Sequence, residues 1–266
     1  MKVLFRFLFL LLVLFTIPVN SQNFQEYLGI LKLNDSSLIS YQLNLTEIDG
    51  IISGFSVTDL GGNHETKSNI TGSYNKDLDL LSFREVGIIY TKSTISDYDF
   101  CYVHFEGKMN NINSNKNIDG KFNGRYNDGS TCINGEIMLK NVVKIEKKAT
   151  RIDKTIQKSK RISAEVKSKV NLTQTLDSLK MNILKTGQNL SMFSSEPVLN
   201  LKIYDAGKVD GDRITIMVND SVILRNYEVS KIIKHLKIPL IMRNTKVQVK
   251  AINTGSISPN TARIEI

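Results

Sequence analysis

Residues 39–57 read Ile-Ser-Tyr-Gln-Leu-Asn-Leu-Thr-Glu-Ile-Asp-Gly-Ile-Ile-Ser-Gly-Phe-Ser-Val, the pattern of two short β-strands joined by a tight turn. Apolar residues alternate from Ile39 to Leu45 and again from Ile51 to Val57. Asp49-Gly50 between them is a common hairpin turn. Because alternation with a period of two places one set of side chains on one face, the stretch predicts a half-buried hairpin.

The same pattern continues from Tyr27 to Lys140. The expected strands, eight in all, are 27–33, 39–45, 51–57, 70–74, 78–91, 100–109, 118–126 and 132–139. A repeated apolar-x-Gly-x-aromatic phrase, at Ile70–Tyr74 and Ile118–Phe122, permits sharp bending of a sheet. We therefore expect an eight-stranded antiparallel meander barrel or curled sheet over residues 22–141. This architecture is loosely similar to that of avidins and lipocalins, which implies no ligand.

Five aromatic residues on these strands could line a cavity if the barrel is closed and hollow. They are Tyr41, Phe55, Tyr74, Phe122 and Tyr126. Such a barrel would carry a small hydrophobic ligand. A filled interior is equally compatible with the sequence, because eight strands leave little room beyond their own side chains.

Cys101 and Cys132 are the only cysteines in the chain. In an exported protein a disulfide between them is the first expectation. The alternation argues against it, because Cys101 shares an apolar face with Val103 whereas Cys132 falls on the polar face of its strand. A β-bulge near Asn134-Gly135 would reverse that phase. Both possibilities stay open.

The first 21 residues have the organisation of a secretory signal peptide. Lys2 and Arg6 accompany an apolar run from Val3 to Ile17, and a small residue, Ser21, precedes the expected cleavage site. The run is too short for a membrane span, which needs about 20 apolar residues. We expect an exported protein that is periplasmic, on the outer surface or secreted.

Residues 142–195 are expected to form a long basic helix and linker. The alternation stops there, and apolar residues recur at helical spacing: Ile145, Ala149, Ile152, Ile156, Val166 and Val170. A helix of some 40 residues would be about 60 Å long. A phase slip near Asn171 indicates either a coiled-coil stutter or two helices with a break. Between Lys140 and Lys169 eleven Lys and Arg face three acidic residues, a net charge of +8.

Three interpretations of this helix remain open. It is a solvated spacer between domains, or it self-associates through its apolar seam as a coiled coil, or it binds an anionic component of the cell envelope. The candidate anion-binding residues are Lys147, Lys148, Arg151, Lys154, Lys158, Lys160 and Arg161. Nucleic acid is the least favoured partner, because no recognition motif is present.

From residue 196 the β pattern resumes, with strands expected at 198–204, 213–218, 222–224, 232–238, 247–252 and 263–266. These suit a small immunoglobulin-like sandwich. The stretches Val209-Asp-Gly-Asp212 and Gly255-Ser-Ile-Ser-Pro-Asn-Thr-Ala262 are similar to a C-terminal module found on many exported proteins of Bacteroidota, over residues 197–266. The resemblance implies an envelope or secreted protein with a β-sandwich ending, and no particular activity.

Two groups of residues could carry chemistry. Asp205, Asp210 and Asp212 with Asn219 could supply oxygen ligands to calcium, although Asp-Gly-Asp also forms ordinary turns. His64, in a polar turn at a barrel mouth, is the centre of the alternative that the protein is an envelope enzyme. No nucleophile elbow or zinc motif accompanies it. The sequence therefore favours a non-enzymatic binding or structural role.

Overall fold

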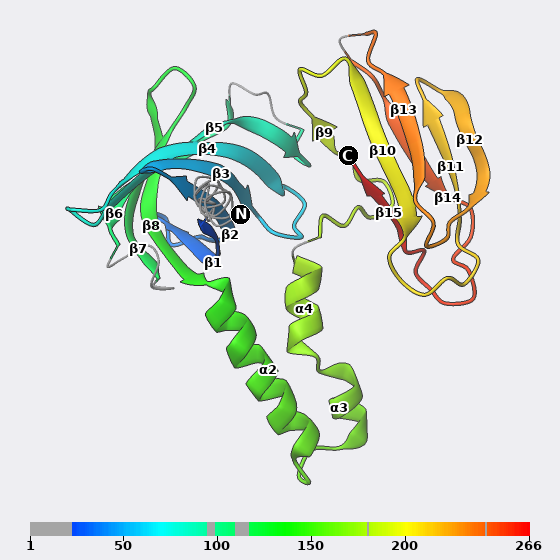
Figure 1. Cartoon of the computed structure of the whole chain (residues 1–266), viewed down its shortest axis with the longest axis horizontal. Helices are drawn as coiled ribbons and strands as arrows, with labels where there is room; N and C mark the ends of the chain where they lie inside the picture. Colours follow the sequence, from blue (N-terminus) through cyan, green and yellow to red (C-terminus); the bar gives the residue numbers. More distant parts are fainter. Residues whose placement is uncertain (1–22, 95–98, 110–116, 180, 243) are drawn as a thin grey trace, which may run out of the picture. The chain divides into compact units, whose positions relative to one another are not determined.

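The computed structural model describes residues 23–94, 99–109, 117–179, 181–242 and 244–266 (Figure 1). The predicted signal peptide lies outside these ranges. The chain divides into two compact units, with the boundary between Phe193 and Ser194. We refer to them as the N-terminal and the C-terminal unit.

The N-terminal unit contains a closed antiparallel barrel, which confirms the predicted eight-stranded meander. Its strands are β1 (Asn23–Leu33), β2 (Leu38–Ile48), β3 (Ile51–Thr58), β4 (Thr66–Asn75), β5 (Leu80–Thr91), β6 (Tyr102–Lys108), β7 (Ile118–Arg125) and β8 (Thr131–Asn141). Each strand pairs with the next, and β1 pairs with β8, so that the sheet closes on itself. Closure pairs both edges of every strand and thus removes sites for edge-to-edge aggregation.

Side chains from all eight strands form one buried apolar cluster inside the barrel. Three of the five predicted lining residues belong to it, namely Tyr41, Tyr74 and Phe122. Tyr126 does not, because β7 ends at Arg125 and Tyr126 begins the following turn, where 37% of its surface is exposed.

The predicted phase of β3 is wrong. In the β2–β3 hairpin Leu43 lies opposite Ser56, and cross-strand partners share a face. The two-residue turn therefore pairs the odd-numbered interior positions of β2 with even-numbered positions of β3. Phe55 consequently lies on the other face, where the ammonium of Lys67 sits 3.7 Å from its ring centroid.

A disulfide joins Cys101 to Cys132, with the Cα atoms 5.9 Å apart. It depends on a bulge, because β8 advances three residues from Thr131 to Asn134 while β7 advances two. The extra residue changes the phase of β8 as one of the two sequence interpretations requires. Gly124 lies against the pair, and a Cβ there would come within 2.5 Å of the sulfur of Cys101.

The predicted single helix of about 40 residues is wrong, whereas the alternative of a break near Asn171 agrees with the structure. Three shorter helices take its place, α2 (Val142–Lys158), α3 (Ala164–Lys169) and α4 (Leu172–Leu179). Ser159 ends α2 with an extended backbone, and the side chain of Ser163 caps α3 by accepting from the Val166 N–H. Serine competes for backbone hydrogen bonds and favours helix ends over helix interiors. Among the described residues, none of the helices combines the length and the apolar content that crossing a membrane requires.

The helices form a hairpin whose two ends are attached to the barrel. α2 follows β8 directly, and α4 contacts α2 (Figure 1). The Asp153 carboxylate of α2 accepts from the main-chain N–H groups of Leu172 and Thr173 at 2.9 and 3.0 Å, and so caps α4. After α4 the chain returns to the barrel, where β9 (Ser191–Met192) pairs with β5.

The C-terminal unit consists of two three-stranded sheets. Strand β10 (Val198–Asp205) lies between β13 (Lys234–Pro239) and β15 (Ala262–Glu265), and β11 (Arg213–Val218) lies between β12 (Ser221–Glu228) and β14 (Val247–Ala251). The sheets share one core, formed by Leu201, Ile203, Ile214, Ile216, Val229 and Ile238. The immunoglobulin-like assignment of this unit stays a prediction.

Replacing both cysteines by serine should lower the free energy of unfolding of the N-terminal unit by about 3–4 kcal/mol, because the disulfide closes a loop of 31 residues. Urea denaturation measures the effect. The wild-type protein under reducing conditions should match the double variant. Equal stability of the oxidised protein and the double variant would contradict the expectation.

Candidate metal centre

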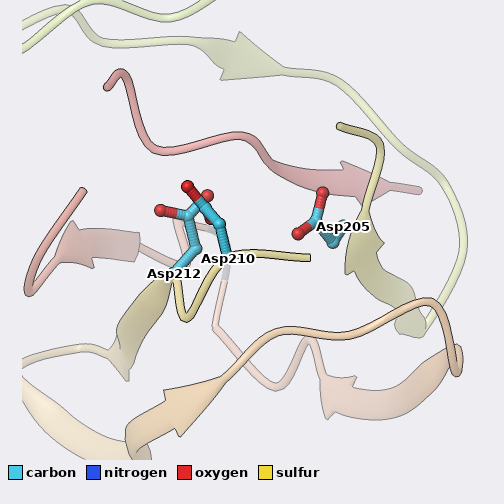
Figure 2. A group of neighbouring side chains, drawn as sticks. All are labelled: Asp205, Asp210 and Asp212. Carbon is cyan, nitrogen blue, oxygen red and sulfur yellow. The ribbon is translucent and has the colours of Figure 1, made fainter. Parts of the chain in front are cut away.

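Three aspartates meet where the two sheets of the C-terminal unit come together. Asp205 is the last residue of β10, and Asp212 immediately precedes β11. Between Asp210 and Asp212, Gly211 adopts φ +92°, a left-handed conformation that favours glycine. One carboxylate oxygen of each aspartate lies within 4.8 Å of the others (Figure 2).

Two of these carboxylates share Thr261 as a donor. The Asp212 Oδ2 accepts from the Thr261 main-chain N–H at 2.6 Å and lies 3.0 Å from its hydroxyl. The same hydroxyl lies 3.2 Å from the Asp205 Oδ1, which also accepts from the Gly207 N–H at 2.7 Å. Because a hydroxyl carries one proton, it serves one carboxylate at a time.

The third carboxylate holds the loop between β14 and β15. The Asp210 Oδ2 accepts from the Ile257 main-chain N–H at 2.7 Å. The Asp210 main-chain oxygen accepts from the Ser256 N–H at 3.0 Å. A Cβ at Gly255 would come within 2.4 Å of the Asp210 Oδ1, so that glycine leaves room for the carboxylate.

In each aspartate one carboxylate oxygen thus accepts a hydrogen bond from the chain, and the other has no hydrogen-bond partner among the described residues. The Oδ2 of Asp205 and the Oδ1 atoms of Asp210 and Asp212 are buried and have no hydrogen-bond partner among the described residues. Only 1% of Asp205 and none of Asp212 is exposed. A buried ionised carboxylate is costly unless it is paired or coordinates a metal.

The nearby ammonium of Lys231 forms no ion pair with the three carboxylates. It donates to the main-chain oxygens of Asp205, at 3.0 Å, and of Gly207. Within the described parts of the chain, no lysine or arginine forms an ion pair within 4 Å with any of the three carboxylates. The arrangement therefore brings three carboxylates together without an ion-paired lysine or arginine among the described residues, as a hard cation site requires.

Buried carboxylates of the barrel are compensated by the chain itself. Glu85 accepts from the hydroxyls of Tyr41 at 3.0 Å and Ser56 at 2.6 Å, and from the Val103 N–H at 2.7 Å. Burial raises the pKa of Glu85, and these hydrogen bonds oppose that rise.

Glu65 is a second buried carboxylate that the chain compensates, in this case with a charged partner. It accepts from the Tyr90 hydroxyl at 2.9 Å, the Gly61 N–H at 2.6 Å and the buried Lys92 ammonium at 3.5 Å. Burial, followed by the nearby Glu65 charge, raises the pKa of Tyr90.

Asn219 does not belong with the aspartates, and the predicted ligand set is wrong in this respect. It follows the C-terminal end of β11, whereas Asp212 precedes its N-terminal end. A strand of six residues is about 20 Å long. The Asn219 side chain instead accepts from the Lys246 N–H at 2.9 Å. Thr261 and Ile257 were not predicted as site residues, although both lie in the stretch that carries the module resemblance.

The other predicted site residues lie elsewhere. His64 is exposed, and its Nδ1 lies 3.1 Å from the Ser93 hydroxyl. The nearby Asp59 carboxylate accepts from the His64 main-chain N–H at 2.9 Å. Within the described chain no carboxylate hydrogen bonds to the ring of His64, so His64 and Ser93 lack the carboxylate that orients the histidine of a catalytic triad. The seven basic residues proposed for anion binding are all exposed, on α2 and in the turn that follows it.

No protein-family model matches the chain, and neither a curated protein nor a solved structure shows significant similarity to it. The function of the protein is therefore inferred from the geometry of its sites.

The compensation of Glu85 can be tested by replacement. Glu85→Leu should lower the free energy of unfolding by about 2–4 kcal/mol, because three buried donors lose their acceptor. Glu85→Gln should change the pH dependence. Because the pKa of Glu85 is higher in the folded than in the unfolded state, the wild type should lose stability as pH rises above the unfolded value of about 4.3.

Urea denaturation between pH 4 and 8 would measure this loss. Glu85→Gln should lack it, whereas the control Glu106→Gln, at an exposed position on β6, should keep it. The same pH slope in Glu85→Gln and in the wild type would refute the role of Glu85.

Proposed function

We propose that the protein is an exported, non-enzymatic binding or structural protein whose C-terminal unit binds Ca²⁺ through Asp205, Asp210 and Asp212. Two observations carry the proposal: one oxygen of each of the three carboxylates lies within 4.8 Å of the others, and each carboxylate has a buried oxygen without a hydrogen-bond partner among the described residues. The other oxygen of each carboxylate accepts a hydrogen bond from a main-chain N–H group, which holds the carboxylate in place.

The chemistry of the donors favours calcium over other metals. All three ligands are carboxylate oxygens, whereas zinc sites are usually built with nitrogen or sulfur. Ca²⁺ accepts six to eight oxygens in flexible geometry, so water and main-chain oxygens can complete the shell. Mg²⁺ requires nearly ideal octahedral geometry and loses water reluctantly. Extracellular calcium modules commonly have Kd values of about 10⁻⁴–10⁻³ M, which suits an exported protein.

The bound ion would have a structural role. Asp205 ends a strand of the first sheet, Asp212 precedes a strand of the second, and Thr261 precedes β15. A cation on the three carboxylates would therefore link both sheets and fix the loop between β14 and β15. A cation would also remove the mutual repulsion of the aspartates, which otherwise opposes folding.

Several observations support export and a non-enzymatic role. The N-terminal segment is organised like a signal peptide, and the Cys101–Cys132 disulfide suits an oxidising compartment. The predicted lining residues Tyr41 and Tyr74 pack into the apolar cluster of the barrel, which favours a structural over a carrier role. The immunoglobulin-like sandwich and the module resemblance remain part of this proposal.

The helical segment keeps its proposed role as a spacer. Part of the apolar seam predicted to mediate self-association is covered within the chain, because α2 contacts α4 and Ala149 is buried, whereas Ile152 and Val166 of the seam are exposed.

Adding Ca²⁺ at about 100 times its Kd should stabilise the C-terminal unit by about 2.7 kcal/mol, which raises its Tm by about 10–20 °C. Asp212→Asn should abolish this response. In EDTA the same variant should be at least as stable as the wild type, because one uncompensated charge is removed. Differential scanning calorimetry measures both effects.

Asp220→Asn is the matched control, because its carboxylate is exposed in the β11–β12 turn of the same unit. It should respond to Ca²⁺ like the wild type. A wild-type Tm that is equal in Ca²⁺ and EDTA, or an equal loss of response in both variants, would overturn the calcium proposal.

A further inference from the structure

Five basic residues of α2 form a single stripe along the helix. They are Lys144, Lys147, Arg151, Lys154 and Lys158. Their spacing alternates between three and four residues, which keeps them on one face of a helix with 3.6 residues per turn. From Lys144 to Lys158 the stripe extends over about 21 Å.

Among the residues that the structure describes, no acidic side chain pairs with the positive charges of the stripe. All five residues are exposed, and none forms an ion pair within 4 Å with a described residue. The acidic residues of α2, Glu146 and Asp153, lie toward its opposite face by helical periodicity. Asp153 in addition caps α4. The stripe therefore offers five closely spaced cations to a partner.

The opposite face of α2 limits what that partner can be. By helical periodicity Ala149, which is buried, and the half-buried Ile145 and Ile156 lie near Asp153, which caps α4, and of this apolar face only Ile152 is exposed. An interfacial helix must bury its apolar face in the bilayer, usually with Trp or Phe as anchors. Residues 142–179 contain no aromatic side chain, and histidine is absent as well. The same composition removes the stacking platforms that single-stranded nucleic acids use.

We propose that the basic stripe of α2 binds a linear acidic polysaccharide. An extended polymer with regularly repeated carboxylate, sulfate or phosphate groups can follow a straight line of cations without apolar contacts or stacking. The expected export of the protein places the stripe among extracellular glycans. The proposal is independent of the metal centre, which lies in the other unit.

The test uses the full-length mature protein and polygalacturonate as the probe, with affinity measured by isothermal titration calorimetry at low and high salt. In one variant the five residues of the stripe are replaced by Gln. The control variant carries Gln at five exposed lysines elsewhere: Lys108, Lys121, Lys202, Lys208 and Lys250. Both variants lose the same net charge, and circular dichroism verifies their fold.

The wild type should bind polygalacturonate more weakly as salt increases. The stripe variant should lose at least about tenfold in affinity, while the control variant stays within about twofold of the wild type. Equal losses in the two variants would reduce the effect to net charge and overturn the proposal. So would no binding by the wild type at low salt.

Two further binding measurements, with oligothymidine and with lipid vesicles, distinguish an acidic polysaccharide from other polyanions. Stripe-dependent binding that is tighter to oligothymidine than to polygalacturonate would assign the surface to nucleic acid. Stripe-dependent binding confined to vesicles that contain phosphatidylglycerol would assign it to membranes. Either result would overturn the polysaccharide proposal.

Discussion

The structure depends on the compensation of buried carboxylates. In the barrel, Glu85 receives three hydrogen bonds and Glu65 a buried ammonium, so that negative charge can be placed inside a small β structure. Lys92 also connects the barrel to the segment that follows α4, because its ammonium donates to the main-chain oxygen of Ile183 at 3.1 Å. In the C-terminal unit the same constraint holds for Asp205, Asp210 and Asp212, but among the described residues only one oxygen of each carboxylate has a hydrogen-bond partner. The three carboxylate oxygens without a partner are the physical reason to assign a cation to this unit.

The strands of the barrel could be predicted because alternation and turn residues are local properties of a sequence. The interior face of β3 could also have been derived, since a two-residue turn at Asp49-Gly50 places odd-numbered positions opposite even-numbered ones. Because Ile51 and Phe55 are apolar, the pattern instead indicated that the odd-numbered residues of β3 face the interior. Ile51 is in fact 66% exposed. The break between α3 and α4 was indicated by the phase slip near Asn171, whereas the break between α2 and α3 depends on Ser159 and Ser163, through which the apolar spacing continues in phase.

The candidate site was predictable to the extent that its residues are close in sequence. Asp210 and Asp212 flank a glycine, and Asp205 ends the preceding strand, so local pattern indicated all three. Asn219 was included because it is near in sequence, although β11 carries it to the far end of the sheet. Thr261 and the loop before it reach the site only through the pairing of β15 with β10, a long-range contact that local pattern does not encode.

Amide hydrogen exchange tests most directly whether a cation completes the carboxylate cluster. The amides of Gly207, Ile257 and Thr261 donate to the three aspartates and should exchange more slowly in Ca²⁺ than in EDTA. The amides of Asn219 and Lys246, at the other end of β11, should exchange at the same rate in both conditions. Equal exchange of the three site amides in Ca²⁺ and EDTA would contradict the account.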